Sequence, residues 1–409
     1  MELLSLPPEE LARRIELERR LLADPSLDKD VRARLEQNQA QLKEERIRYR
    51  KTMRRKYEAL RQRREEYPLQ KFLPFLEACH SFSLAAKVQA NLLKSAKGEI
   101  RGEAKGEVKV EAINSIGQRY PQQIIPWEDF QAKQNDIWNQ LASFADQCRF
   151  PSQYKCDSVR SQLQHIRCEQ KLWEFEVGNI ENAVHGLIKT VNEDSLLRDS
   201  LGLHGIVTFS PHPARDVEDH GDPVPFGDVT HTNHFCVYET SDGPEFAKTA
   251  IQNISPQELT QDMVIEGLVS EIRPYRDVIN KSGKNPAQTP KARAAAAVTQ
   301  LFSRMVDKGI QYGYLCIGQT YVFLFIPDNP AIVYYHVSVP DLDVRDDDES
   351  RFYKTAVGQV FAFVLQSLRM DSPPQAWYDA AEKLSVWPVE SEDVRSRVHG
   401  SVCEGPASA

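Results

Sequence analysis

The sequence contains no stretch that approaches the roughly 18 consecutive apolar residues of a membrane span. Its first residues, MELLSLPPEELARR, carry acids where a signal peptide needs an apolar segment. The seven cysteines are an odd number, lie scattered along the chain and form no Cys-x-x-Cys pair. We therefore expect a soluble protein of the cytoplasm or nucleus, with reduced thiols and no contact with a membrane.

Several catalytic signatures are also missing. The sequence has no Gly-x-Ser-x-Gly elbow, no glycine-rich phosphate loop ahead of a helix, and no set of kinase motifs. Cys316 lies in the apolar stretch GIQYGYLCIGQ, which favours a buried, inert thiol over a nucleophile. These features argue against serine, cysteine and kinase chemistry.

What the chain does contain is enough apolar material for a core and one concentrated basic segment. Of the 409 residues, 41% are hydrophobic and 9% aromatic. The net charge of −8 hides an asymmetry, because Lys43 to Arg64 holds eleven Lys and Arg against three Glu, a local +8 that leaves −16 elsewhere. We expect this segment to behave differently from the rest of the chain.

The composition divides the chain into four predicted regions. Residues 1–66 are rich in Glu, Arg, Gln and Leu and form a helical, basic N-terminal arm, whose broken apolar seam gives only weak support for a coiled coil. Residues 67–175 are a mixed, partly helical linker and accessory region, in which the Gly-Glu repeats of 97–111 are typical of a linker or exposed ribbon. Residues 176–388 form an α/β core, and 389–409 a disordered tail.

Apolar periodicity and turn signals define the elements of the core. They predict, in order, a helix at 180–191, strands at 204–209, 233–239 and 246–254, a helix at 255–272, a helix at 290–308, strands at 311–317, 320–326 and 331–338, and a helix at 353–370. The helix after the third strand is expected to begin at Ser255, because Ser-Pro-Gln-Glu has capping-box spacing.

The order helix, three strands, helix, strand is that of restriction-endonuclease-like nucleases. We therefore predict an α/β (α+β) fold with such a core, an added hairpin, C-terminal helices and the N-terminal helical arm. That chemistry needs an Asp on one strand and Glu-x-Lys on the next, because the acids hold a divalent cation and the Lys assists the attacking water. Many α/β domains share this order, so it is weak support by itself.

The chain also resembles a large, mostly uncharacterised fungal family. The resemblance is carried by FLEACHSFSLA, IIPWEDFQAKQNDIWNQL, GLVSEIRPYRDVINK, KARAAAAVTQLFSRMVDKGIQYGYLCIGQTYVFLFIPDNPAIVYYHVSVP, TAVGQVFAFVLQSLR and WYDAAEKLSVW, within 73–387. Longer members carry a protein-kinase-like domain after this region, which this chain lacks. The resemblance implies a restriction-endonuclease-like core.

In that family the second core strand has Arg-Pro-Asp and the third has Glu-Tyr-Lys followed by Pro. The matching stretches here, HTNHFCVY and AIQNISPQELT, place Asn233 at the Asp position, Gln252 at the Glu position and Ile254 at the Lys position. The resemblance also assigns the helix acid to Glu181 and matches Gln300 to a Gln of the following helix.

These substitutions remove two negative charges that would offset the dehydration of Mg²⁺, and Ile254 can donate neither a hydrogen bond nor a proton. We therefore expect a catalytically inactive recognition module for nucleic acid or protein, with no catalytic residues and no cofactor.

Two alternatives retain a metal. Acids such as Glu239, Glu258 or Glu266 could have taken over the ligand role, which would give an active Mg²⁺-dependent nuclease. The loop from 204 to 234 has five histidines among several acids, of which His212, Asp216 and His220 are spaced four apart. Its Pro and Gly content argues against a rigid site, so a solvated loop is the preferred interpretation.

The basic segment is the other functional candidate. Its cations would ring much of a helix, interleaved with Tyr49 and Tyr57, and suit phosphate contacts or nuclear import: Arg48, Arg50, Lys51, Arg54, Arg55, Lys56, Arg61, Arg63 and Arg64. A solvated, protein-binding helix is the competing interpretation, including an adaptor that forms homo-oligomers through its N-terminal helices.

Overall fold

The computed structural model describes residues 28–42, 44, 48, 51, 55, 69–99, 113–142, 149–151, 153–203, 205–210, 233–240, 245–281 and 288–388. The chain divides into two compact units, residues 1–69 and 70–409. In the first unit, residues 29–42 form a helix. None of the helices within the described ranges is long and apolar enough to cross a membrane.

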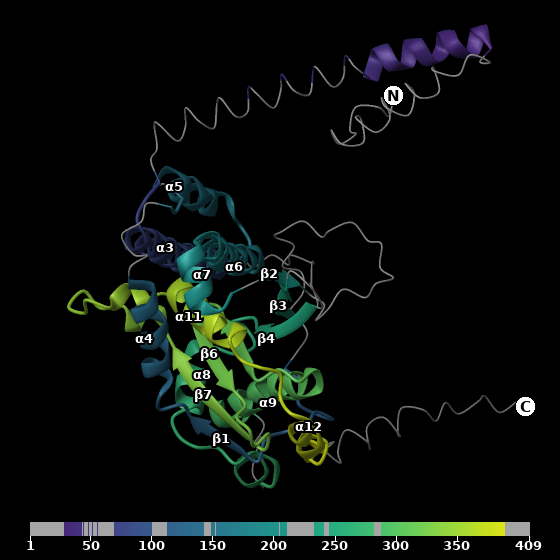
Figure 1. Ribbon diagram of the computed structural model, residues 1–409. Coiled ribbons are helices and arrows are strands. Elements are labelled where there is room, and N and C mark those ends of the chain that lie inside the picture. Colours follow the sequence, from purple (N-terminus) through teal and green to yellow (C-terminus); the bar gives the residue numbers. More distant parts are fainter. Residues whose placement is uncertain are drawn as a thin grey trace, which may run out of the picture. The chain divides into compact units, whose positions relative to one another are not determined.

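A seven-stranded mixed sheet lies at the centre of the second unit (Figure 1). Its order is β1-β7-β6-β5-β4-β3-β2, in which β1 and β7 are parallel, β4 and β5 are parallel, and the other pairs are antiparallel. The strands are β1 (Gln123–Pro126), β2 (Gly205–Ser210), β3 (Asn233–Thr240), β4 (Glu245–Asn253), β5 (Tyr312–Ile317), β6 (Thr320–Phe325) and β7 (Ile332–Ser338). The predicted mixed α/β class is confirmed.

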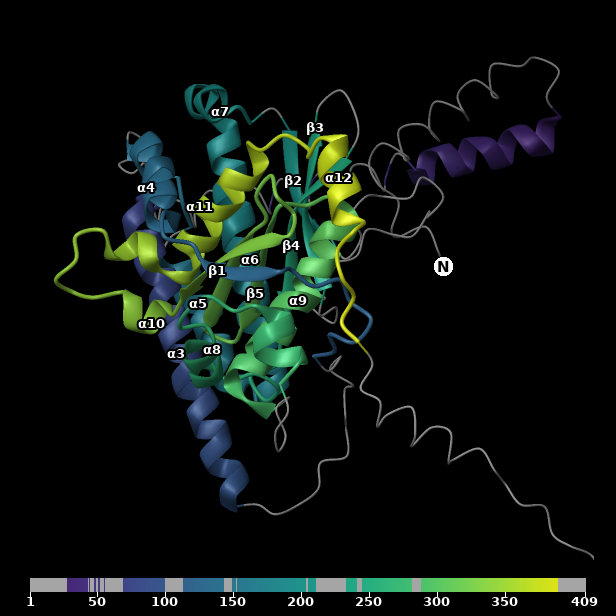
Figure 2. The same ribbon diagram turned by 90° about the horizontal axis from the view of Figure 1, so that it is seen from below.

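Helices cover both faces of this sheet (Figure 2). Each face has its own apolar core. One core is shared with α3 (Phe72–Glu99), α4 (Phe130–Leu141), α6 (Glu169–Glu193), α7 (Ser195–Leu201) and α11 (Ala356–Leu368). The other is shared with α8 (Gln261–Gly267), α9 (Pro290–Lys308) and α12 (Gln375–Ala381). Shorter elements are α5 (Gln153–Gln162), η3 (Leu163–His165), η4 (Tyr275–Ile279), α10 (Pro340–Asp343) and η6 (Arg351–Lys354).

Local sequence determines the ends of α9 as predicted. The Thr289 hydroxyl accepts a hydrogen bond from the Ala292 amide at 3.2 Å, and Pro290 occupies the first turn. Gly309 ends the helix with a φ of +66°, a conformation that favours glycine. The chain order helix, three strands, helix, strand is present as α6, β2 to β4, α9 and β5, with α7 and α8 added.

Two predicted helix starts are wrong. Ser255 to Glu258 form a turn, with the Glu258 amide 2.9 Å from the Ser255 carbonyl, and α8 begins later, behind the Thr260 cap. It also ends before Ile272, because the Ile272 backbone is paired with Ile124 of β1. α11 begins at Ala356 rather than at 353, since the Thr355 hydroxyl caps it by accepting from the Gly358 amide at 3.1 Å.

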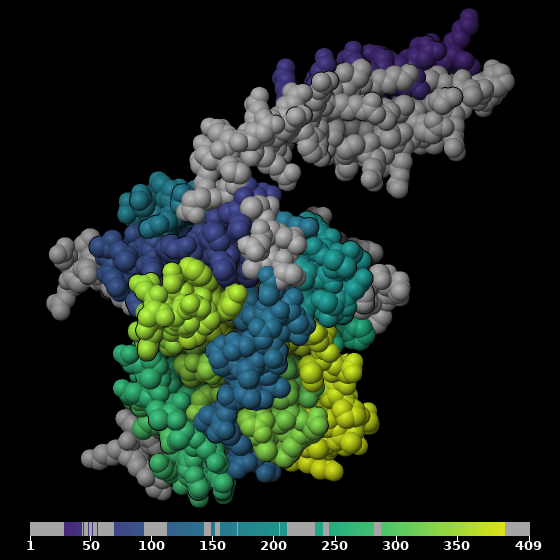
Figure 3. Space-filling view, turned by 60° about the vertical axis from the view of Figure 1, so that its left-hand side comes forward, coloured from purple at the N-terminus to yellow at the C-terminus, as the bar shows by residue number. Residues whose placement is uncertain are grey.

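The described residues of α3 and α4 pack on the core. The predicted boundary after residue 175 falls inside α6, and Phe72 and Trp138 belong to the same apolar cluster as Phe361 of α11. In Figure 3, α3 lies beside the surface segment 340–354, where Lys87 forms an ion pair with Asp341. The predicted linker lies outside the described residues beyond Glu99, as does the predicted tail 389–409.

Candidate functional site

A buried polar cluster joins α6 to the carboxyl end of β4. His234 of β3 donates from Nε2 to the Glu181 carboxylate of α6 at 2.5 Å, and the two side chains are 8% and 12% exposed. The Asn253 amide of β4 lies 3.4 Å from the same imidazole nitrogen. The Asn253 Oδ1 atom is buried without a hydrogen-bond partner among the described residues. An acid, an imidazole and an amide therefore meet on the α6 face of the sheet.

The Glu181 carboxylate influences the side chains around it. Cys236 of β3 is fully buried; burial first, and the Glu181 charge second, raise the pKa of its thiol well above the usual range. Burial and then Glu181 likewise raise the pKa of the Tyr314 phenol. Cys316 is buried in β5, and burial, then the charge of Glu176, raise the pKa of its thiol, so it is a poor nucleophile at neutral pH.

The positions assigned from the resemblance do not all share one face of the sheet. Gln252 Oε1 accepts from Arg304 of α9 at 3.4 Å, and Ile254 is buried in the α9-side core. Glu181 lies on the opposite face, with α6. The backbone of Asn233 pairs with that of Gln252.

The sequence assignment missed His234 and Asn253, the immediate neighbours of Asn233 and of Gln252. Because alternate strand residues point to opposite faces, a shift of one position moves a side chain to the other side of the sheet. His234 is the backbone partner of Ile251, so these two share a face with Asn253.

The acids considered as replacement ligands lie apart from this cluster. Glu239 is exposed and pairs with Glu245 at the far end of β3. Glu258 follows β4 in a turn, where burial raises the pKa of its carboxyl, and Glu266 is exposed on α8. Within the described ranges, no group of three or more His, Cys, Asp and Glu side chains could hold a metal ion.

The remaining candidates are only partly visible. Arg48, Lys51 and Arg55 are helical and exposed, whereas Arg50, Arg54, Lys56, Arg61, Arg63 and Arg64 lie outside the described residues. His212, Asp216 and His220 lie outside them too. Gln300 is on α9, with its amide oxygen buried and without a partner in the described part of the chain.

A cleft of about 410 Å³ opens at the carboxyl ends of β4 and β5, between α3, α6 and α8. Its walls include the apolar side chains of Leu172, Trp173 and Ile317, and the carboxylates of Glu169, Glu176 and Asp262. Lys87 also lines it, but its ammonium group is paired with Asp341. The cleft is thus partly apolar, and carboxylates outnumber cations among the residues that line it.

Glu176 lines this cleft and is buried. Burial raises the pKa of its carboxyl to about 7, although Gln319, which donates to Glu176 Oε1 at 2.9 Å, opposes the shift. The same Gln319 amide donates to the Ser83 carbonyl of α3. Glu176 is therefore a buried acid poised to change protonation near neutral pH.

Part of this unit is similar to known proteins. Residues 248–385 match the family described as "Spore killer 2 N-terminal domain". The match runs from β4 to just beyond α12. The "Meiotic driver SPOK2" of the fungus Podospora anserina is 33% identical over 86 residues, which are 20% of this chain and 11% of that protein. These matches support a relationship with a fungal spore-killer family. No solved structure matches.

Proposed function

We propose that α6 to α12 form a restriction-endonuclease-like core that has lost its catalytic ion site and serves as a binding module. The proposal is supported by the sheet, in which the antiparallel strands β2, β3 and β4 are followed, across α9, by β5 parallel to β4. It is also consistent with the similarity to a spore-killer domain, which by itself implies no chemistry for this chain.

The observation that carries the proposal is the state of the Glu181 carboxylate. It accepts a hydrogen bond from His234, and the β4 residues on that face, Ile251 and Asn253, are uncharged. Mg²⁺ gives up hydration water reluctantly and needs anionic oxygens to compensate. One engaged carboxylate beside an amide and an isoleucine offers too little charge to hold it.

The test of inactivity is direct. We expect the natural chain to leave single- and double-stranded DNA and RNA intact in Mg²⁺ and in Mn²⁺. Substitutions that rebuild the charges on the α6 face, His234→Asp, Ile251→Glu and Asn253→Lys, should create Mn²⁺ binding measurable by calorimetry. The matched control places the same charges one position away along β3 and β4, by Asn233→Asp, Gln252→Glu and Ile254→Lys. It should create no Mn²⁺ binding. Metal-dependent cleavage by the natural chain would overturn the proposal.

The electrostatics of the cleft favour a protein ligand over nucleic acid there. A groove that binds phosphates presents Lys and Arg side chains, whereas this one presents Glu169 and Asp262 and a Lys87 that is already paired. Contacts with nucleic acid, if the chain makes them, are assigned by this proposal to the basic segment 43–64. Binding of a DNA duplex that is unchanged when 43–64 is neutralised would contradict that division.

A further inference from the structure

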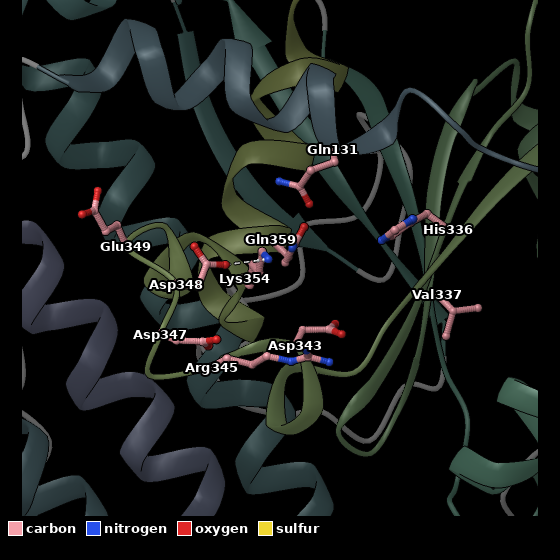
Figure 4. Close-up of a pocket in the computed structure, with 10 residues that line it drawn as sticks. All are labelled: Gln131, His336, Val337, Asp343, Arg345, Asp347, Asp348, Glu349, Lys354 and Gln359. Carbon is pink, nitrogen blue, oxygen red and sulfur yellow. Dashed lines mark ion pairs between the residues drawn. The ribbon is translucent and has the colours of Figure 1, made fainter.

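A separate cavity of about 600 Å³ lies at the end of β7, between α4, α10 and the start of α11. Figure 4 shows side chains from these elements converging on it, among them Gln131, His336 and Gln359. The matched family segment contains most of its walls, but Gln131 of α4 lies before that segment. Nothing in the degenerate nuclease proposal makes use of this cavity.

One wall of the cavity holds an unpartnered amide. Gln359 of α11 is only 3% exposed, and its Oε1 atom has no hydrogen-bond partner among the described residues. In Figure 4 its side chain is directed into the cavity, toward the amide of Gln131. An uncompensated buried amide costs about 1–3 kcal/mol, so a ligand that supplies hydrogen bonds is favoured here.

The lining of the cavity is also acidic. Four carboxylates line the cavity, Asp343, Asp347, Asp348 and Glu349, against the cations Arg345 and Lys354. Four negative and two positive groups leave a formal charge of −2. The ion pair between Asp348 and Lys354, at 2.7 Å, accounts for one charge of each sign. Asp347 and Glu349 are exposed on the loop that forms part of this lining.

His336 also lines the cavity and adds no positive charge to it. His336 stacks on Phe130, with ring centroids 4.0 Å apart, and burial lowers the pKa of its imidazole to about 4. At neutral pH the ring is therefore uncharged and offers one acceptor nitrogen. The cavity combines acceptor atoms with negative charge, while no described group of acids and histidines is arranged to hold a metal ion.

From this arrangement we propose that the cavity bounded by Gln131, His336, Asp347, Glu349 and Gln359 binds a guanidinium group. A guanidinium presents five N–H donors in one plane and carries a permanent positive charge, so it matches carboxylates and amide oxygens together. The group comes either from an arginine of a protein segment or from a small guanidinium compound. The basic segment 43–64 of a second copy is one source of such arginines.

Calorimetric titration of the full chain tests the proposal with three probes. Agmatine supplies a free guanidinium, a synthetic peptide of residues 43–64 supplies protein-borne arginines, and tetramethylammonium supplies charge without donors. We expect agmatine to bind and tetramethylammonium not to bind. A peptide that binds at least about tenfold more tightly than agmatine assigns the site to a protein segment, and equal or weaker binding assigns it to a small compound.

Substitutions localise the binding. Asp347→Asn with Glu349→Gln should weaken agmatine binding about tenfold, and Gln359→Met should weaken it by a similar factor. Asp328→Asn is the matched control, because Asp328 is an exposed acid in the turn at the other end of β7 and does not line the cavity. If Gln359→Met fails to fold, the loop variant, Asp347→Asn with Glu349→Gln, still tests whether agmatine binds in this cavity.

Absence of agmatine and peptide binding at millimolar concentration would overturn the proposal. So would binding that the loop variant leaves unchanged, or that tetramethylammonium reproduces.

Discussion

Gln252 and Asn253 follow one another in β4, yet the Gln252 amide meets Arg304 of α9 while the Asn253 amide meets His234 beneath α6. Consecutive residues of β4 therefore point to opposite faces of the sheet, each with its own core, and only those on the α6 face can share a site with Glu181. This alternation also explains why the rebuilt ion site proposed above uses His234, Ile251 and Asn253.

The buried contact between His234 and Glu181 should contribute measurably to stability. Replacing His234 with Ala leaves a buried carboxylate without its partner, and we expect a loss of about 3 kcal/mol in the free energy of unfolding, measured by urea denaturation. Lys133→Ala is the control, because it removes an exposed ion pair with Asp129 on α4. Its effect should be close to zero. Equal effects of the two substitutions would show that the buried contact contributes no more to the free energy of unfolding than the exposed ion pair does.

Glu176 should make stability depend on pH. Its folded pKa of about 7 exceeds the ordinary value of 4.5, so the folded state holds this proton more tightly than the unfolded state. The contribution of Glu176 to the free energy of unfolding is therefore fully present below about pH 4.5 and is lost as pH rises through about 7. The difference of about 2.5 pKa units corresponds to roughly 3 kcal/mol.

Glu176→Gln keeps a neutral group of similar size and should remove this dependence. Denaturation between pH 5 and 8 should show the natural chain losing stability relative to the variant as pH rises. Parallel stability curves for the two proteins would mean that Glu176 is ionised in the folded state throughout this range.

Two helix-ending glycines provide a matched comparison. Gly202 and Gly309 have φ values of +67° and +66°, but a Cβ at Gly202 meets nothing within 4 Å, whereas one at Gly309 would lie 2.2 Å from the Tyr378 hydroxyl oxygen. Gly202→Ala should cost about 1 kcal/mol, for backbone strain alone. Gly309→Ala should cost more, because Tyr378 of α12 must also move.

Removing the tyrosine tests that explanation. In the background of Tyr378→Ala, the cost of Gly309→Ala should fall to that of Gly202→Ala, measured by the same denaturation experiment. If Gly309→Ala still cost more than Gly202→Ala in that background, contact with Tyr378 would not be the cause of the difference.

The basic segment should show its role in the salt dependence of nucleic-acid binding. Arg48, Lys51 and Arg55 are exposed and helical, and each phosphate contact contributes about 0.9 to the slope of log K against log salt concentration for duplex DNA. Changing all three to Gln should lower the slope by roughly 3 if each contacts a phosphate.

Lys133, Arg160 and Lys189 provide the control, since they are cations on α4, α5 and α6, of which Arg160 and Lys189 are exposed and Lys133 is partly exposed. Changing these three to Gln should leave the slope unchanged. An equal decrease for both sets would indicate a diffuse effect of net charge, and no decrease for the first set would exclude the segment from the contact. Light scattering on the same proteins tests the adaptor alternative, which requires an oligomer.

Local sequence was sufficient for much of the fold. Strand lengths, the hairpin at Gly318 and both ends of α9 follow from short-range rules, because capping, turn formation and alternation depend on neighbours along the chain. The extent of α6 was underestimated, since Trp173 and Val177 continue the apolar stripe of Val184 toward Glu169. The start of α8 was misplaced, because Ser255 and Thr260 both have the chemistry of a cap and only the folded chain uses Thr260.

The sequence by itself determined the α/β class and the concentration of positive charge at 43–64. The tertiary structure decided which residues meet. It aligned β3 with β4 so that His234 faces Glu181, and it enclosed α11 on every side. The periodicity of apolar residues determines whether a segment is a helix or a strand. Strand register and the packing of distant helices determine toward which neighbours each side chain points.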